Sequence, residues 1–213
     1  DKVQLLLKGN VAGIGDIDEL KEVIEILLRQ REFENTEKIV SRIINNLSSD
    51  SEKVRSKSVE SLSRILPLFK KNNLTQKTYD YILSLLAQKI EDDSELVRDE
   101  AFKAIAFKGN LDVTPYLLKQ LGKKNILMRQ SFNEFRIKLI DTCGEIGDET
   151  VIPELSKILK AKSFLTVLEN SEIRLAAVKA LSKIKSNESK SILEFVAAND
   201  NREVIKNEAK ISL

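Results

Sequence analysis

Histidine and tryptophan are absent from the 213 residues of this chain, and cysteine and methionine occur once each. Without histidine the chain cannot build a Ser-His or Cys-His nucleophilic pair, a histidine-containing zinc site, or the commonest general base. A single cysteine excludes an internal disulfide. No Walker A loop, dinucleotide-binding glycine motif or EF-hand pattern is present. We therefore expect a protein that is not an enzyme and that holds no cofactor or metal.

Residues that break helices are also scarce, with 7 glycines, 3 prolines and 5% aromatic residues. This composition predicts an all-α chain. The longest apolar runs, such as 23–28, are too short to span a bilayer, so no membrane span is expected. The net charge is +2, from 17 basic and 19 acidic residues in 1–106 and 18 basic and 14 acidic residues in 107–213. Neither half has the strongly basic character of a dedicated nucleic-acid binder.

One short pattern recurs along the chain. An apolar residue followed by a basic residue opens each copy, and small or apolar residues follow four, seven and eight positions later, as in Val97, Ala101, Ala104 and Ile105. These positions form one stripe on an α-helix. The other copies begin at Val54, Phe135, Ile173 and Ile205. Steps of 43, 38, 38 and 32 residues between the copies are typical of a helical solenoid.

The residues between the copies repeat as well. Residues 39–55 read IVSRIINNLSSDSEKVR, and residues 82–98 read ILSLLAQKIEDDSELVR. Both segments contain an apolar helix, an Asp-Ser-Glu turn and the opening of the next helix. We expect Asp50 and Asp93 to act as N-caps, because a side-chain oxygen there can accept the free N–H groups of the first helical turn.

Glycine and proline occupy matching positions at two other turns. Each glycine is expected to end one helix, and each proline to lie in the first turn of the next, for the pairs Gly109 with Pro115 and Gly147 with Pro153. At these residues and in the recurring pattern, the chain resembles HEAT-repeat proteins of the armadillo-like type, specifically the PBS-lyase-like HEAT repeats of bacteria. The resemblance covers about 17–213. It implies a right-handed α-solenoid of about five HEAT-like antiparallel helix pairs, with partial units at the ends.

We expect a single repeat array over 1–213. The helix pairs are expected at 16–47, 51–90, 94–121, 132–160 and 171–198, with a partial unit at 202–213. In the second pair, the first helix is expected to end at about residue 66 and to be followed by a loop. Residues 1–15 are interpreted as the end of a truncated upstream repeat. At the other end, a partner or further sequence would cover the last apolar face.

Two sets of residues have both a structural and a functional interpretation. Cys143 could be a nucleophile or a bilin attachment point, but it shares the register of Ile105 and Leu181, which favours a place in the core. The basic residues that open the repeats could form an anion-binding row. Pairing with an acidic residue of their own or the adjacent turn is favoured, because they repeat in register with core residues; they are Arg55, Arg98, Arg136, Arg174 and Lys206.

The second helices of such pairs usually line the concave face of a solenoid. Aligning them predicts a binding site with two columns of residues, which contains Lys38, Tyr81, Tyr116 and Glu154 in one column and Lys119 and Lys157 in the next. The two tyrosines attract most interest, because exposed tyrosine is a common interface anchor. Half-buried packing of these tyrosines is an equally good alternative.

The resemblance implies a non-enzymatic scaffold or adaptor for protein–protein interaction, with a protein partner on the concave helix face. The alternative is a nucleic-acid-binding protein of the DNA-repair type, which the near-zero charge and the lack of tryptophan disfavour. A bilin-lyase-like role rests only on the name of the repeat subtype. The metal-dependent hydroxylases among HEAT-like enzymes use His-Glu ligand pairs, which have no counterpart here. The sequence specifies neither the partner nor the oligomeric state.

Overall fold

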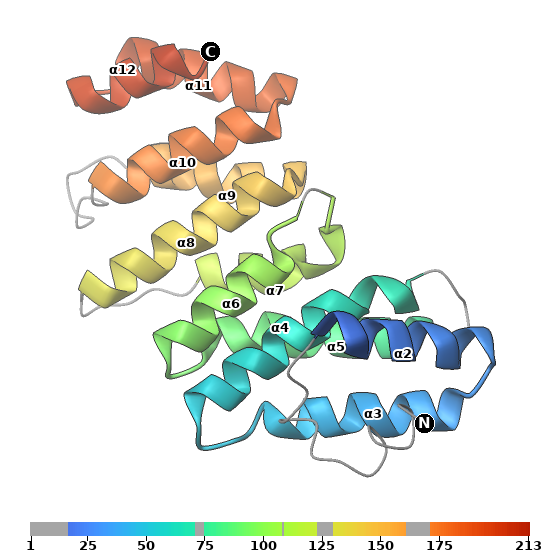
Figure 1. Ribbon diagram of the computed structural model, residues 1–213. Coiled ribbons are helices and arrows are strands. Elements are labelled where there is room, and N and C mark those ends of the chain that lie inside the picture. Colours follow the sequence, from blue (N-terminus) through green and yellow to red (C-terminus); the bar gives the residue numbers. More distant parts are fainter. Residues whose placement is uncertain (1–16, 71–74, 108, 123–129, 161–170) are drawn as a thin grey trace. The chain divides into compact units, whose positions relative to one another are not determined.

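A computed structural model describes residues 17–70, 75–107, 109–122, 130–160 and 171–213 (Figure 1). Within these ranges every regular element is a helix, and no residue lies in a strand. The chain divides into two compact units, an N-terminal unit of Asp1–Ile105 and a C-terminal unit of Ala106–Leu213. Consecutive antiparallel helices follow one another in each unit. The prediction of an all-α solenoid of helix pairs is therefore confirmed.

The N-terminal unit contains two helix pairs and a further first helix. Its elements are α2 (Ile17–Arg29), α3 (Phe33–Asn46), α4 (Glu52–Phe69), α5 (Gln76–Gln88), a 3-10 turn η2 (Lys89–Glu91) and α6 (Glu95–Ile105). Helix α2 packs on α3, and α4 packs on both α5 and α6. Apolar residues at helical spacing form the core, and Ile43, Leu62 and Ile82 are almost fully inaccessible to solvent. The core therefore lies along the stripes that the repeat pattern marks.

The C-terminal unit has the same plan. Its elements are a 3-10 turn η3 (Leu111–Val113), α7 (Thr114–Leu121), α8 (Gln130–Ile146), a second 3-10 turn η4 (Glu149–Val151), α9 (Ile152–Lys160), α10 (Ser171–Ile184), α11 (Asn187–Asn199) and α12 (Glu203–Ile211). The first helices stack, α8 on α10 and α10 on α12. Helices α8 and α10 approach closely at Gly144, where a methyl group would lie 2.8 Å from Cα of Ala180.

Glycine ends a helix as predicted at Gly147 but not at Gly109, because α6 ends at Ile105 and the N–H of Gly109 donates to the carbonyl of Ile146 on α8 at 2.9 Å. Gly147 follows α8 with φ of +76°, and its N–H donates to the carbonyl of Cys143 at 3.1 Å. Gly109 has φ of +81°. Both values lie in the left-handed region, which glycine adopts without a steric penalty. Pro115 lies in the first turn of α7, and Pro153 is the second residue of α9, so the predicted prolines are confirmed.

Helix α4 is longer than predicted. It runs through Pro67 to Phe69, whereas the sequence pattern predicts an end at about residue 66. Proline removes one helical hydrogen bond and usually breaks a helix. Here the next turn buries Phe69, which is 1% exposed, and the carbonyl of Phe69 accepts the hydroxyl of Thr75 at 2.7 Å. Burial of an aromatic ring accounts for the extension.

The predicted N-caps at Asp50 and Asp93 are wrong. Ser51 is the N-cap residue of α4, and no side chain there accepts a first-turn N–H. Before α6, the carboxylate of Asp92 accepts the N–H of Ser94 at 3.1 Å. Asp93 instead accepts a hydrogen bond from Arg55, 38 residues earlier. The local pattern predicts that Asp93 caps a helix, but its carboxylate is instead paired with Arg55 of the preceding repeat.

The single repeat array and the truncated upstream repeat stay predictions. The boundary between the two units falls between α6 and α7, inside the predicted third pair, so the single array stays a prediction. The interpretation of 1–15 lies outside the described residues.

In the described ranges, no helix is both long and apolar enough to cross a membrane. The same ranges hold no group of three or more His, Cys, Asp and Glu side chains that could bind a metal.

Candidate functional site

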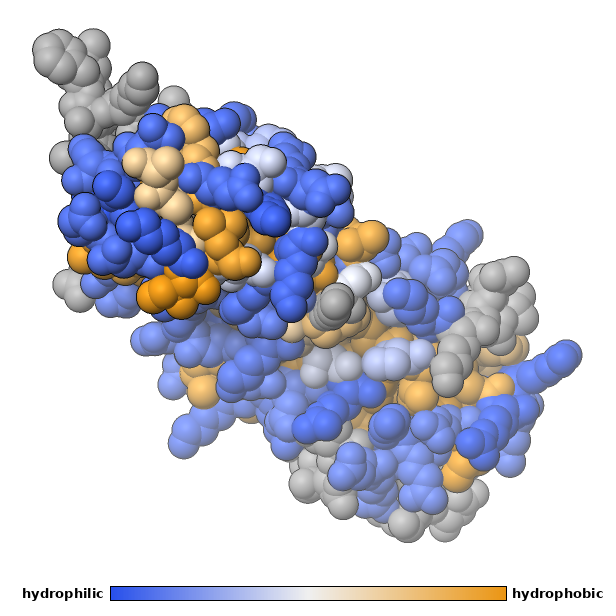
Figure 2. All heavy atoms as spheres, turned by 90° about the horizontal axis from the view of Figure 1, so that it is seen from above, coloured by the Kyte–Doolittle hydropathy of each residue, from blue (hydrophilic) through white to orange (hydrophobic). Residues whose placement is uncertain are grey.

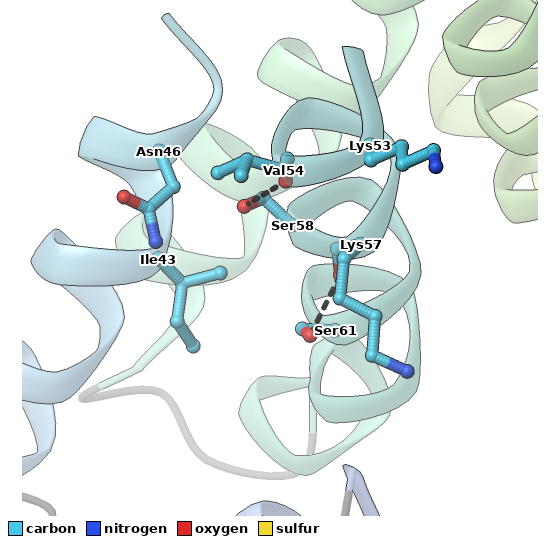
Figure 3. Close-up of a pocket in the computed structure, with 7 residues that line it drawn as sticks. All are labelled: Ile43, Asn46, Lys53, Val54, Lys57, Ser58 and Ser61. Atoms are coloured by element: carbon cyan, nitrogen blue, oxygen red, sulfur yellow. Dashed lines mark hydrogen bonds between the residues drawn. The ribbon is translucent and has the colours of Figure 1, made fainter. Parts of the chain in front are cut away.

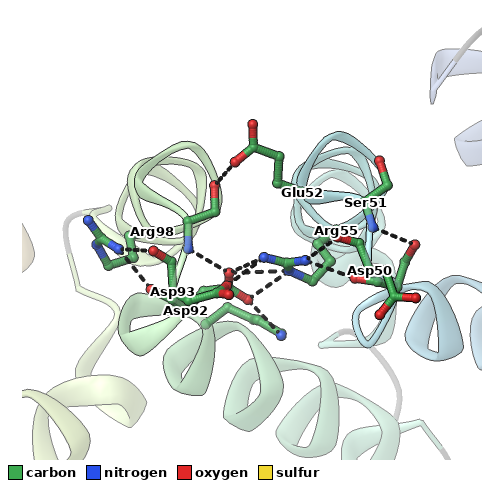
Figure 4. Close-up of polar contacts among 10 residues, drawn as sticks. Asp50, Ser51, Glu52, Arg55, Asp92, Asp93 and Arg98 are labelled. Atoms are coloured by element: carbon green, nitrogen blue, oxygen red, sulfur yellow. Dashed lines mark hydrogen bonds and ion pairs between the residues drawn. The ribbon is translucent and has the colours of Figure 1, made fainter.

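Arg55 ties two successive turns of the N-terminal unit together (Figure 4). Its Nη1 donates to the carbonyls of Ser49 at 2.8 Å and Asp50 at 3.2 Å, in the turn before its own helix. Its Nη2 donates to the carboxylates of Asp92 at 2.8 Å and Asp93 at 2.6 Å, in the turn before α6. The acidic partners of Arg55 are therefore carboxylates of the adjacent turn. The interpretation that the basic row pairs with acidic residues of the chain is confirmed at Arg55.

Asp92 is the centre of this cluster. Its side chain is 4% exposed, and burial alone would raise its pKa. Hydrogen bonds from Arg55 and Lys89 to the carboxylate, and one from the N–H of Ser94, outweigh burial and hold the pKa of Asp92 well below its usual range. Asp92 therefore stays ionised at neutral pH and keeps the cation of Arg55 in place.

The C-terminal unit repeats this arrangement. Arg174 donates from Nη2 to the carbonyl of Leu159 at 3.0 Å and to the carboxylate of Asp200. The two side chains of this ion pair are 7% and 3% exposed. The N–H of Arg202 donates to the other oxygen of Asp200 at 3.0 Å. A buried arginine thus joins one repeat to the next in both units.

The acidic partners Asp92 and Asp200 were missed in the sequence. Each accepts the N–H of the residue two positions later, as Asp148 also does for Thr150. This local turn is a common use of aspartate. An aspartate thus recurs in the turn before a helix, and this recurrence was the sequence signal that could have identified Asp92 and Asp200.

Cys143 lies in the core, as its register predicts. Its side chain is fully buried on α8. Burial, with a smaller contribution from the charge of Asp148, raises the pKa of the thiol to about 12. A thiol with that pKa is almost wholly protonated at neutral pH, and the thiolate is the nucleophilic form. The functional interpretation of Cys143 therefore has no chemical support.

The two tyrosines predicted at the binding site are exposed. Tyr81 on α5 is 54% exposed and Tyr116 on α7 is 38% exposed. The residue after each one, Ile82 or Leu117, is fully buried. Half-buried packing therefore describes Tyr116 better than Tyr81. Both rings have an apolar face and a hydroxyl that a partner could reach.

The charged residues predicted for this site are also at the surface. Lys38 contacts Glu34 at 2.6 Å, and that hydrogen bond lowers the pKa of Glu34. Lys157 contacts Glu154 at 2.5 Å in the same manner, within one helix. Exposed pairs of this kind add little to stability and can exchange partners. Lys119 is exposed and forms no ion pair with other described residues.

The six predicted residues fall into two groups. Lys38 and Tyr81 belong to the N-terminal unit, on α3 and α5. The other four belong to the C-terminal unit, on α7 and α9; they are Tyr116, Lys119, Glu154 and Lys157. All six lie on second helices. A single surface that includes both groups stays a prediction.

A further set of exposed apolar residues was missed in the sequence. Phe195 is 54% exposed on α11, and Val204 and Ile211 are 63% and 80% exposed on α12. Figure 2 shows hydrophobic residues among hydrophilic ones at the α11 and α12 end of this unit. The repeat register places Val204 and Ile211 where α10 has Glu172 and Lys179. The sequence signal for this exposed set was available, because the preceding repeat has charged residues at the two positions where α12 has Val204 and Ile211.

Comparison with known proteins gives one family match. Residues 124–213 match the family described as HEAT repeats. No curated protein is similar enough in sequence to match. Among solved structures, the chain is similar to human deoxyhypusine hydroxylase in complex with glycerol, at 14% identity over 99% of this chain and 82% of that chain, with a TM-score of 0.48. It is also similar to the designed armadillo repeat protein YIII(Dq.V1)4CPAF in complex with peptide (KR)4, at 19% identity over 100% and 98% of the two chains, with a TM-score of 0.44.

Proposed function

Because the chain is a HEAT-repeat protein, we propose that it is a non-enzymatic scaffold that binds a partner protein through its second helices. The observation that carries this proposal is the exposure of Tyr81 and Tyr116 beside fully buried core residues. The two tyrosines share one register position on α5 and α7. Tyrosine is enriched at interfaces, because its rigid ring contributes a large contact area and its hydroxyl a hydrogen bond.

The buried arginine clusters support this function indirectly. Arg55 and Arg174 fix the turns that lead from one helix pair to the next, through hydrogen bonds to both the backbone and carboxylates. Helices held in this way need little reordering when a partner binds. A preordered surface loses less conformational entropy on association, which increases affinity.

The charged residues of the second helices provide the polar part of the contact. Lys119 has no ion pair with described residues, and Lys157 can exchange Glu154 for an acidic group of a partner. Aromatic anchors surrounded by polar residues are the usual composition of a protein interface. We expect the partner to present a helix or an extended segment with at least one acidic residue.

The proposal is tested by affinity capture with matched baits. The test variant carries Tyr81→Ala, Tyr116→Ala, Lys119→Glu and Lys157→Glu. A control variant carries Leu96→Ala and Lys103→Glu on α6, a first helix, where both residues are exposed. Each bait must have the melting curve of the wild type. We expect a protein that the wild type and the control capture and that the test variant loses.

Two results would count against the proposal. Capture that is equal for the test variant and the wild type would remove the second helices as the binding site. Capture of nucleic acid in place of protein, weakened by added salt, would favour the nucleic-acid-binding alternative.

A further inference from the structure

A pocket and an apolar stripe both lie outside the proposed binding surface. The pocket, of about 340 Å³, opens between α3 and α4 in the N-terminal unit (Figure 3). Residues from both helices line it; they are Ile43, Asn46, Lys53, Val54, Lys57, Ser58 and Ser61. The hydroxyls of Ser58 and Ser61 donate to helix carbonyls, both at 2.8 Å. Lys53 points away from Asn46, so the polar groups of the pocket do not converge on a ligand.

The apolar stripe consists of Val204 and Ile211 on α12. These residues are seven positions apart and therefore lie on the same side of the helix, where they are 63% and 80% exposed. Asn207 lies between them on the same side and is exposed as well. A different side of α12 packs within the unit, because Ile205 and Ala209 are fully buried. The stripe is thus a second apolar side of a short helix.

A further repeat would not cover the apolar stripe. The same register positions in α10 are Glu172 and Lys179, and both are exposed although α11 and α12 follow and pack on α10. By contrast, Leu213 has the register position of Leu181, which is fully buried. The position of Leu213 is therefore one that a following repeat covers, whereas the two positions of the stripe face outward from the array.

Charge is the rule at these two outward positions. Each of the four preceding copies of the repeat has at least one charged residue there; the pairs are Lys53 and Glu60, Leu96 and Lys103, Glu134 and Asp141, and Glu172 and Lys179. A charged residue keeps such a position in water, because removing a charge from water without a partner is costly. The apolar pair of α12 is the exception, and its removal from water is favourable.

Glu203 and Lys210 flank the apolar stripe on one edge. They are also seven positions apart, each directly before a residue of the stripe, and both are exposed. Glu203 pairs with Lys206 of its own helix at 3.5 Å, and Lys210 forms no ion pair with described residues. Glu208, on the opposite edge, is half-buried within the unit. The exposed edge of the stripe is therefore negative at its N-terminal end and positive at its C-terminal end.

We propose that the apolar stripe of α12 binds the same stripe of a second copy of this chain, with the two helices antiparallel and a two-fold axis beside Asn207. Val204 of one copy then contacts Ile211 of the other, and the two Asn207 amides can hydrogen-bond at the axis. Glu203 of each copy lies opposite Lys210 of the other. A parallel pair would instead place like charges side by side. The net charge of +2 adds little long-range repulsion between copies.

The size of the contact sets the expected affinity. Helix α12 has nine residues and is about 14 Å long, at about 1.5 Å per residue. Two such helices bury less than about 1,200 Å² in total, as transient interfaces do, so we expect a Kd on the order of 100 μM. The assay is sedimentation velocity of the full chain between about 10 μM and about 1 mM. A chain that stays monomeric, or that assembles beyond a dimer, would overturn the proposal.

The apolar contact is tested with Val204→Ser and Ile211→Ser combined, which should weaken the dimer at least about tenfold. Leu213→Ser is the matched control, because it removes an apolar residue that is 53% exposed but lies outside the stripe, and it should leave dimerisation unchanged. The substituted residues are exposed, so the dilute variants should keep the melting curve of the wild type. Unchanged dimerisation of the double variant, or its loss in Leu213→Ser, would overturn the proposal.

The antiparallel orientation is tested with Glu203→Lys and Lys210→Glu in separate proteins. Each substitution places like charges opposite each other at two sites and should weaken the dimer at least about fivefold. An equimolar mixture of the two variants should dimerise as the wild type does, because every contact between them joins opposite charges. A parallel dimer would respond to neither substitution, because like charges face each other before and after it. Dimerisation that neither substitution weakens, or a mixture that dimerises no better than its components, would overturn the proposal.

Discussion

The substitution Gly144→Ala is expected to destabilise the protein, although alanine forms helices better than glycine. A methyl group at Gly144 on α8 would lie 2.8 Å from Cα and 3.1 Å from Cβ of Ala180 on α10. Favourable carbon–carbon contacts are about 3.5–4.0 Å. Neither atom of Ala180 belongs to a long side chain that could turn away, so the two helices would have to separate.

The magnitude follows from two opposing effects. Overpacking of a well-packed core costs about 1–3 kcal/mol. Replacement of glycine by alanine inside a helix stabilises by about 1 kcal/mol. We therefore expect Gly144→Ala to lower the free energy of unfolding by about 1 kcal/mol, or the melting temperature by about 2–4 °C for a chain of this size.

The assay is urea unfolding followed by circular dichroism, with Gly122→Ala as the matched control. A methyl group at Gly122 would meet only carbonyl oxygens, at 3.5 and 3.8 Å, which are ordinary contacts. Gly122→Ala is therefore expected to be neutral or to stabilise by up to about 1 kcal/mol. A Gly144→Ala protein as stable as the wild type would refute the close packing of α8 on α10.

Three further predictions concern buried groups. Asp200→Asn leaves the guanidinium of Arg174 without its carboxylate and should lower the free energy of unfolding by about 3 kcal/mol in urea; an unchanged midpoint would contradict a buried ion pair. The folded-state pKa of Asp92 is depressed, so its stabilising contribution is present above the usual aspartate pKa of about 4 and is lost as the pH falls below that value. Between pH 6 and pH 3, the melting temperature of Asp92→Asn should therefore fall less than that of the wild type. Equal falls in the two proteins would count against this. Cys143 should react with a thiol reagent only in urea, and rapid labelling of the folded protein would show that it is accessible.

The sequence predicts the helices well because their signals are local. Apolar spacing and the glycine at Gly147 mark helices and their ends within a few residues. The extension of α4 through Pro67 was not predicted, because it depends on the burial of Phe69 against other helices. The partners of Arg55 lie 37 and 38 residues away, and a local pattern of caps assigned one of them differently.

The candidate site was predicted in part. The register of the second helices marks Tyr81 and Tyr116 as outward positions, and both are exposed. The pocket between α3 and α4 could not be predicted, because Ser58 has the same register as Ala101 and Ala177, which are fully buried in other repeats. Whether a neighbouring helix fills a seam depends on tertiary packing, which periodicity does not encode.

The most direct test of the scaffold function is photo-crosslinking from single positions. A photoreactive phenylalanine analogue replaces Tyr81 or Tyr116 on second helices, and in separate proteins Leu96 or Lys179 on the outward side of first helices. Our account predicts that the two tyrosine positions crosslink to the same partner protein in lysate and that the two first-helix positions do not. Crosslinks to a partner from Leu96 or Lys179, with none from either tyrosine position, would contradict it.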